Sequence, residues 1–139
     1  MLDLDEVSVD IAGAPVLRRV SLHVPAGGRV ALLGRNGAGK TTTLRTLMGL
    51  LTPRNGRIAV AGADGARLPA HHRARLGIGY APEDRGLFGR FTVRENMLLP
   101  ARLLGLSPGE LDARLDRVFA LLPELRDLAP RHAAGLSGG

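Results

Sequence analysis

The sequence predicts an α/β fold, and three features of its 139 residues lead to that prediction. Short β-rich runs punctuated by glycine fill the chain up to about residue 85. One helix beginning at Gly39 interrupts them, and helical patterns replace them from about residue 92. Hydrophobic residues make up 45% of the sequence, so we expect one core and therefore one domain or part of one.

The first half of the chain offers five candidate strands with alternating or continuously apolar character. They are "LDLDEVSV" (2–9), "VLRRVSLHV" (16–24), "RVALLG" (29–34), "GRIAVAG" (56–62) and "GIGYAPE" (77–83). The helix lies between the third and fourth of these runs, and we expect Pro53 to stop it. Its apolar residues recur at helical spacing: Leu44, Leu47, Met48 and Leu51.

Two further helices are predicted by capping boxes, in which a hydroxyl residue is followed three positions later by a glutamate. "TVRENMLLPARLLG" (92–105) begins with Thr92 and Glu95, and "SPGELDARLDRVFALLPEL" (107–125) begins with Ser107 and Glu110. One face of the second helix is apolar, which predicts that this face packs on a core. The face consists of Leu111, Leu115, Val118, Phe119 and Leu122.

The composition argues against several functional classes. The sequence has no cysteine, which excludes disulfides and thiolate metal sites and agrees with a reducing cytoplasm. The acidic start and the lack of a long apolar run predict neither a signal peptide nor a membrane span. A net charge of +6 could indicate nucleic acid, but the arginines are scattered and there are one tyrosine, three phenylalanines and no tryptophan for base stacking. We therefore expect no nucleic-acid partner.

The decisive motif is "GRNGAGKT", which runs from Gly34 to Thr41 and fits G-x-x-x-x-G-K-[ST] between an apolar run and an amphipathic helix. Glycines let the backbone curl around a polyphosphate with its N–H groups inward, and the helix N-terminus adds positive potential. Lys40 is the single lysine among 19 basic residues, and its compact charge suits the β- and γ-phosphates better than a planar guanidinium does. A chance match is expected in roughly one such chain per thousand.

Roles follow for each position of this loop. Thr41 is placed to bind Mg²⁺ through its hydroxyl, and Thr42 could hydrogen-bond the α-phosphate. The predicted phosphate-binding residues are Gly34, Arg35, Asn36, Gly37, Ala38, Gly39, Lys40, Thr41 and Thr42. Taken alone, the loop indicates only a nucleoside triphosphate site, which kinases, GTPases and motor ATPases share.

Three blocks in fixed order narrow the choice. "GRNGAGKTTTLRTLMGLLTPRNGRIAVAG", "GIGYAPEDRGLFGRFTVRENM" and the final "GLSGG" together resemble the nucleotide-binding subunits of ATP-binding cassette (ABC) transporters, over nearly the whole chain. The residues within and between these motifs are most similar to those of the ATPases of branched-chain amino-acid importers and their amide and urea relatives. The resemblance implies a P-loop core with an antiparallel β layer over residues 1–85, then a Q-loop region and part of a helical subdomain over 86–139.

The resemblance also implies further site residues. Ile11 stands about where many relatives place an aromatic residue against adenine, so Ile11 and Val16 are the expected adenine contacts. Glu83 falls at the Q-loop position, which usually carries glutamine, touches Mg²⁺ and signals to the membrane partner; the alternative is a solvated loop acid. The signature residues act on ATP held by a second ATP-binding subunit, in a homodimer or a heterodimer, and are Leu136, Ser137, Gly138 and Gly139.

A groove for a short helix of the membrane subunit is implied near Leu87, Phe88 and Phe91, with burial inside the subunit as the alternative. The function implied is hydrolysis of Mg²⁺-ATP that drives uptake of a small solute, such as branched-chain amino acids, through separate membrane permease subunits. Such a subunit lies in the cytoplasm, peripheral to the inner face of the membrane. The alternatives are a non-transport ABC protein of translation or DNA repair, and an inert truncated product. Relatives carry a Walker B strand and catalytic base after the signature, so we expect no catalytic residue and no turnover within these 139 residues alone.

Overall fold

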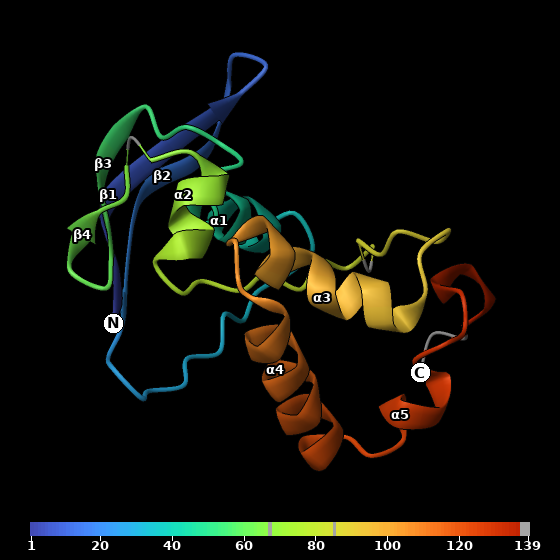
Figure 1. Cartoon of the computed structure of the whole chain (residues 1–139). Helices are drawn as coiled ribbons and strands as arrows, with labels where there is room; N and C mark the ends of the chain where they lie inside the picture. The colour runs from blue at the N-terminus through green and yellow to red at the C-terminus, as the bar shows by residue number, and fades with distance from the viewer. Residues whose placement is uncertain (67, 85, 137–139) are drawn as a thin grey trace. The chain divides into compact units, whose positions relative to one another are not determined.

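The computed structural model describes residues 1–66, 68–84 and 86–136 (Figure 1). Contacts within the chain divide it into two compact units, Met1–Tyr80 and Ala81–Gly139. We describe each unit by itself. The functional division expected after residue 85 stays a prediction.

The first unit is built on a four-stranded antiparallel sheet with the order β2-β1-β3-β4 (Figure 1). Its strands are β1 (Leu2–Ile11), β2 (Ala14–Val24), β3 (Asn55–Val60) and β4 (Ala63–Asp64). A two-residue loop joins β1 to β2, and both loop residues, Ala12 and Gly13, have positive φ angles of 49° and 80°. Such a loop matches the right-handed twist of the paired strands, so the hairpin closes tightly.

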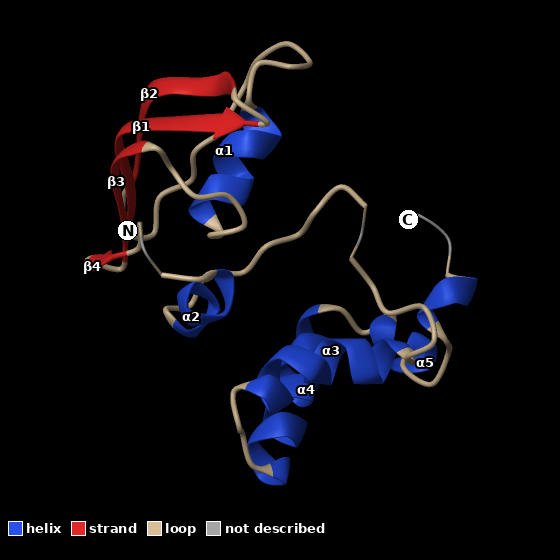
Figure 2. Cartoon of the chain, turned by 90° about the horizontal axis from the view of Figure 1, so that it is seen from above, coloured by secondary structure: helices blue, strands red, loops and turns tan. Residues whose placement is uncertain are grey.

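One face of this sheet carries the core of the first unit. The strands contribute buried aliphatic side chains, and the helix α1 (Lys40–Leu47) adds Leu47. Both views show α1 beside the sheet (Figure 2). A short helix, α2 (Ala70–Arg75), follows β4. The buried members of this cluster are Leu4, Val7, Val9, Leu17, Leu47, Ile58 and Val60.

Two of the five predicted strands are wrong. The runs 29–34 and 77–83 form no strand, whereas the runs 2–9 and 16–24 lie in β1 and β2. The run 56–62 corresponds to β3, which ends at Val60. A strand needs a ladder of hydrogen bonds to a neighbour, and neither run has a ladder with any segment in the described part of the chain. The apolar side chains of the run 29–34 are consequently open to solvent, as the 87% exposure of Leu33 shows. In the run 77–83, Ile78 is partly buried and packs against the core of the first unit.

The helix that follows the phosphate-loop motif ends earlier than predicted. α1 stops at Leu47, ahead of Pro53, because Gly49 adopts a left-handed conformation with φ of 76°. The Gly49 N–H donates to the carbonyl of Thr46 at 3.0 Å, and the Leu50 N–H donates to that of Arg45 at 2.9 Å. This pair of bonds is the Schellman motif, a standard helix stop.

The second unit is helical, with α3 (Val93–Leu103), α4 (Pro108–Leu121), α5 (Leu125–Leu128) and a 3₁₀ turn (Ala133–Gly135). Both predicted capping boxes are confirmed at Thr92 and Ser107. On the predicted apolar face of α4, Leu115 is buried, whereas Leu122 lies past the helix end and is 47% exposed. None of the helices in the described ranges is long and apolar enough to cross a bilayer.

The end of the described chain runs beside the loop that precedes α3. The N–H of Val93 donates to the carbonyl of Arg131 at 2.9 Å, and the N–H of Ala133 donates to that of Phe91 at 2.9 Å. His132 adds a contact from Nδ1 to the carbonyl of Arg90 at 3.0 Å. These bonds fix the segment that leads to Leu136 against the start of α3.

Candidate nucleotide-binding site

Two glycines give the predicted phosphate loop its shape. Gly37 and Gly39 have φ angles of 81° and 91°, a left-handed conformation that costs other residues free energy. Gly39 is also packed, because a Cβ placed on it would lie 2.7 Å from Cδ2 of Leu17 in β2. The loop therefore rests directly on the sheet at the point where α1 begins.

The first turn of α1 leaves its N-terminus open toward the loop. Its cap residue is Gly39, which makes no side-chain cap hydrogen bond, and no acidic residue lies in the first turn. Instead, the N–H and hydroxyl of Thr43 both donate to the Gly39 carbonyl, at 2.8 and 2.9 Å. An uncapped helix N-terminus without nearby acids favours an anion.

The side chain of Lys40, at the end of the loop, reaches back to the residues at which the loop starts. Its Nζ donates to the carbonyl of Gly34 at 2.7 Å and to that of Arg35 at 2.9 Å. The N–H of Ala38 also donates to the Arg35 carbonyl at 3.1 Å, which tightens the turn between them. The ammonium thus lies over the loop backbone. A polyphosphate bound in the loop could replace these carbonyls as the hydrogen-bond acceptor of Lys40.

The remaining loop residues differ in exposure. Arg35, Asn36 and Thr41 are exposed, and Thr42 is half-buried. The Thr42 carbonyl accepts a hydrogen bond from the hydroxyl of Thr46 at 2.7 Å. The Thr41 side chain is therefore accessible to a ligand at the loop.

The two predicted adenine contacts lie on the β1–β2 hairpin. Ile11 and Val16 are exposed by 41% and 37%. The Val16 carbonyl lies 3.7 Å from a Cβ placed on Gly39, which brings Val16 beside the phosphate loop. Ile11 lies at the end of β1, opposite Ala14. The structure thus places Val16 beside the loop backbone.

The other predicted residues belong to the second unit. Glu83 is exposed, Leu136 is half-buried, and the signature residues 137–139 lie outside the described part of the chain. Leu87, Phe88 and Phe91 are exposed by 52%, 55% and 38%, with the two phenylalanine rings 5.4 Å apart. Their exposure argues against the alternative that they are buried within the unit.

Asn96 fixes the backbone of this apolar loop. Its Oδ1 accepts from the N–H of Phe88 at 2.9 Å, and its Nδ2 donates to the Phe88 carbonyl at 3.0 Å. The same Nδ2 donates to the Thr92 carbonyl at 3.0 Å. Asn96 was not among the residues predicted from the sequence, although its position in the first turn of a capped helix is a signal that could have identified it.

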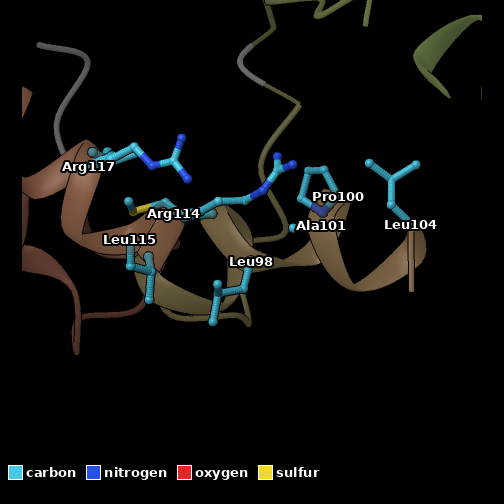
Figure 3. Close-up of a pocket in the computed structure, with 9 residues that line it drawn as sticks. Leu98, Pro100, Ala101, Leu104, Arg114, Leu115 and Arg117 are labelled. Atoms are coloured by element: carbon cyan, nitrogen blue, oxygen red, sulfur yellow. The ribbon is translucent and has the colours of Figure 1, made fainter. Parts of the chain in front are cut away.

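A pocket of about 400 Å³ lies between α3 and α4 in the second unit (Figure 3). Aliphatic side chains line it, and Arg114 and Arg117 add two positive charges from α4. The lining residues are Met97, Leu98, Pro100, Ala101, Leu104, Arg114, Leu115, Arg117 and Val118. None of them is a predicted nucleotide contact.

A family model described as "ABC transporter" matches residues 17–139, which include the phosphate loop. The chain belongs to the ABC transporter family. The lipopolysaccharide export ATP-binding protein LptB of Acidithiobacillus ferridurans is 44% identical over 126 residues, covering 89% of this chain and 51% of that protein. The branched-chain amino-acid transport ATP-binding protein BraG of Pseudomonas aeruginosa is 34% identical over 139 residues, covering 100% of this chain and 59% of that protein.

Solved structures confirm the predicted fold class. An ATP-binding subunit of an ABC transporter superimposes with a TM-score of 0.85 at 33% identity, covering 99% of this chain and 56% of that one. A dimeric ATP-binding cassette with ADP and Pi shares the fold at 22% identity, with a TM-score of 0.83. This ABC chain spans about half the length of the curated relatives that it matches.

Proposed function

We propose that this chain is the nucleotide-binding part of an ABC transporter ATPase and that it binds a Mg²⁺-nucleotide through residues 34–42. The observation that carries the proposal is the geometry of Lys40, whose Nζ lies on the carbonyls of Gly34 and Arg35. The open N-terminus of α1 begins at the same loop. A positive side chain and a helix N-terminus together favour a polyphosphate.

Magnesium would arrive together with the nucleotide. The described residues include no cluster of three His, Cys, Asp or Glu side chains that could hold a metal alone. Mg²⁺ commonly binds through few protein ligands together with substrate phosphates and water, which fits a site with a hydroxyl such as that of Thr41. Bound there, the metal would neutralise phosphate charge. Glu83 is the proposed second ligand, at the Q-loop position.

The same proposal extends to the adenine contacts, the signature and the partners. Val16 and Ile11 would cover the adenine ring from the hairpin, without the stacking that an aromatic residue supplies. Leu136 and the signature residues that follow would act on ATP bound by a second subunit. Leu87, Phe88 and Phe91 would meet a membrane permease at the inner face of the membrane.

A direct binding experiment tests the proposal. Calorimetric titration of the 139-residue chain with Mg²⁺-ADP should show binding that Lys40→Ala removes for the most part. Arg45→Ala is the matched control, because Arg45 is an exposed charge in the last turn of α1, away from the loop. Equal affinity of the unchanged chain and Lys40→Ala would refute the assignment of the loop. ATP and ADP should bind alike, because we place most γ-phosphate contacts on other parts of the transporter.

The transported substrate has two candidates. The residues between the motifs favour branched-chain amino-acid import. BraG and LivF are named for that function, and LivF of Archaeoglobus fulgidus is 35% identical to this chain. The 44% identity to LptB favours lipopolysaccharide export. Complementation decides between them: the full-length gene should restore growth either to a strain that lacks its branched-chain amino-acid importer ATPase or to one depleted of its lipopolysaccharide export ATPase.

A further inference from the structure

Arg73 in α2 is almost completely buried, with 1% of its surface exposed. Its guanidinium donates to backbone carbonyls of two separate segments. Nη1 donates to Thr46 and to Leu47, both at 2.7 Å, at the end of α1. Nε donates to Leu68 at 2.9 Å, and Nη2 lies 3.4 Å from the carbonyl of Ala66. The side chain therefore joins the end of α1 to the segment that follows β4.

The end of α1 needs this donor. The Schellman motif supplies backbone N–H groups to the carbonyls of Arg45 and Thr46 but supplies none to that of Leu47. Leu47 is itself buried, so an unpaired carbonyl there would be costly. Arg73 provides the donor and brings a positive charge to the negative end of the helix.

Gly49 makes room for the guanidinium. A Cβ placed on Gly49 would lie 2.8 Å from Nε of Arg73, and 3.0 Å from the carbonyl oxygen of Leu68. The same glycine holds the left-handed φ of 76° that ends α1. One residue thus serves both the helix stop and the approach of the arginine.

The charge of Arg73 persists in this environment. Burial lowers the pKa of the guanidinium, and the carboxylate of Asp64 partly opposes that change. A guanidinium stays protonated even so, since its ordinary pKa lies far above neutrality. The buried cation is satisfied by carbonyl oxygens, which is the requirement for keeping a charge inside a protein.

We propose that Arg73 is a positioning residue for nucleotide binding, which holds the far end of α1 so that the phosphate loop at its near end keeps its shape. The inference rests on the proposed function of that loop. Leu47 lies seven positions after Lys40, which corresponds to about 10 Å along a helix, so Arg73 acts without touching a nucleotide. Arg73, Gly49 and the carbonyls of Thr46 and Leu47 thus form one contact cluster at the end of α1.

The test compares Mg²⁺-ADP affinities of the 139-residue chain and of variants at a temperature where circular dichroism shows each variant folded. Arg73→Gln should weaken binding about tenfold, because the phosphate loop would lose its fixed position. Arg73→Lys retains the charge but not the forked geometry of the guanidinium. Its affinity for Mg²⁺-ADP should lie between those of the unchanged chain and Arg73→Gln. Arg75→Gln is the matched control, because it removes an exposed arginine from the same helix.

A second pair of variants reaches the same contact from the other side. Gly49→Ala should displace the guanidinium and weaken binding, whereas Gly62→Ala should not. Gly62 has a similar φ of 83° but no atom within 4 Å of a Cβ placed there, so it carries the backbone strain without the clash. Hydrogen exchange of the nucleotide-free chain should be faster in residues 44–50 for Arg73→Gln and unchanged there for Arg75→Gln.

The outcomes separate the two proposals. If the unchanged chain binds no nucleotide, the proposed function is refuted and the positioning role falls with it. If the unchanged chain binds and Arg73→Gln binds equally well, the positioning role alone is refuted. If Arg73→Gln does not fold, Arg73→Lys and Gly49→Ala decide, and unaltered affinity in both would overturn the inference.

Discussion

Gly39 meets two demands at once, a left-handed backbone and close packing on Leu17. Gly39→Ala should therefore cost more than backbone strain, which is about 1–3 kcal/mol for an alanine in this conformation. Gly13→Ala is the control, because Gly13 has a φ of 80° and nothing within 4 Å of a Cβ placed on it. Urea unfolding of both variants checks the prediction, and equal losses of stability would contradict the packing role.

The proposed phosphate loop has a local signal in the sequence, whereas the role of Arg73 has none. The loop residues act as a contiguous motif whose spacing is itself the signal. Arg73 acts through carbonyls 26 and 27 positions earlier in the chain, and its side chain is one arginine among many. Such a contact depends on the tertiary fold, which no local pattern encodes.

Among the elements, the start of α3 depends on the capping box at Thr92. The hydroxyl of Thr92 accepts from the N–H of Glu95 at 3.1 Å, and the Thr92 N–H donates to Oε2 of Glu95 at 2.8 Å. Thr92→Ala should destabilise the second unit by about 1 kcal/mol, the usual loss at an N-cap. Chemical denaturation followed by circular dichroism measures it, and Thr92→Ser should recover most of the loss.

The two capping boxes also make helix stability depend on pH. Hydrogen bonds from the backbone and hydroxyl of Thr92 lower the pKa of Glu95, and the hydroxyl and backbone of Ser107 lower that of Glu110. A carboxyl with a lowered folded pKa stabilises the fold above its ordinary value of 4.5, and this stability is lost as the pH falls through the folded pKa.

Helicity followed from pH 7 to pH 2 should therefore fall at the acidic end. The double variant Glu95→Gln, Glu110→Gln should show a smaller dependence over the same window, because an amide can accept the cap hydrogen bonds but does not titrate there. An identical pH profile for the variant and the unchanged chain would contradict the role of these carboxylates.

Elements with local signals were predicted best. The caps of α3 and α4 are encoded within four residues each, and β1, β2 and β3 follow from alternation. The short helix α2 lacks a side-chain cap hydrogen bond and escaped prediction. The run 29–34 is apolar enough for a buried strand. An apolar run forms a strand only where a neighbouring strand can pair with it, however, and hydrophobicity alone does not show whether such a neighbour is present.

For the whole molecule, the exposed fraction of an apolar side chain predicts how much that residue contributes to the free energy of unfolding. Ile58 is 1% exposed in the core of the first unit, whereas Leu33 is 87% exposed. Ile58→Ala should cost about 2–5 kcal/mol, through lost burial and a cavity. Leu33→Ala should change stability by less than about 0.5 kcal/mol, as is usual for surface sites. Urea unfolding of the 139-residue chain compares them, and a large loss for Leu33→Ala would show that the run 29–34 is packed in solution.

The ammonium of Lys40 is held over the phosphate loop and has no second lysine anywhere in the sequence to compete with it. Apart from the N-terminal amine, an amine-selective acylating reagent can therefore modify one site in the native chain. Mg²⁺-ADP should protect that site, because a nucleotide bound on the Lys40 side chain would block the approach of the reagent. A mass spectrum of the labelled, unsubstituted protein would then report directly how much of the loop is occupied.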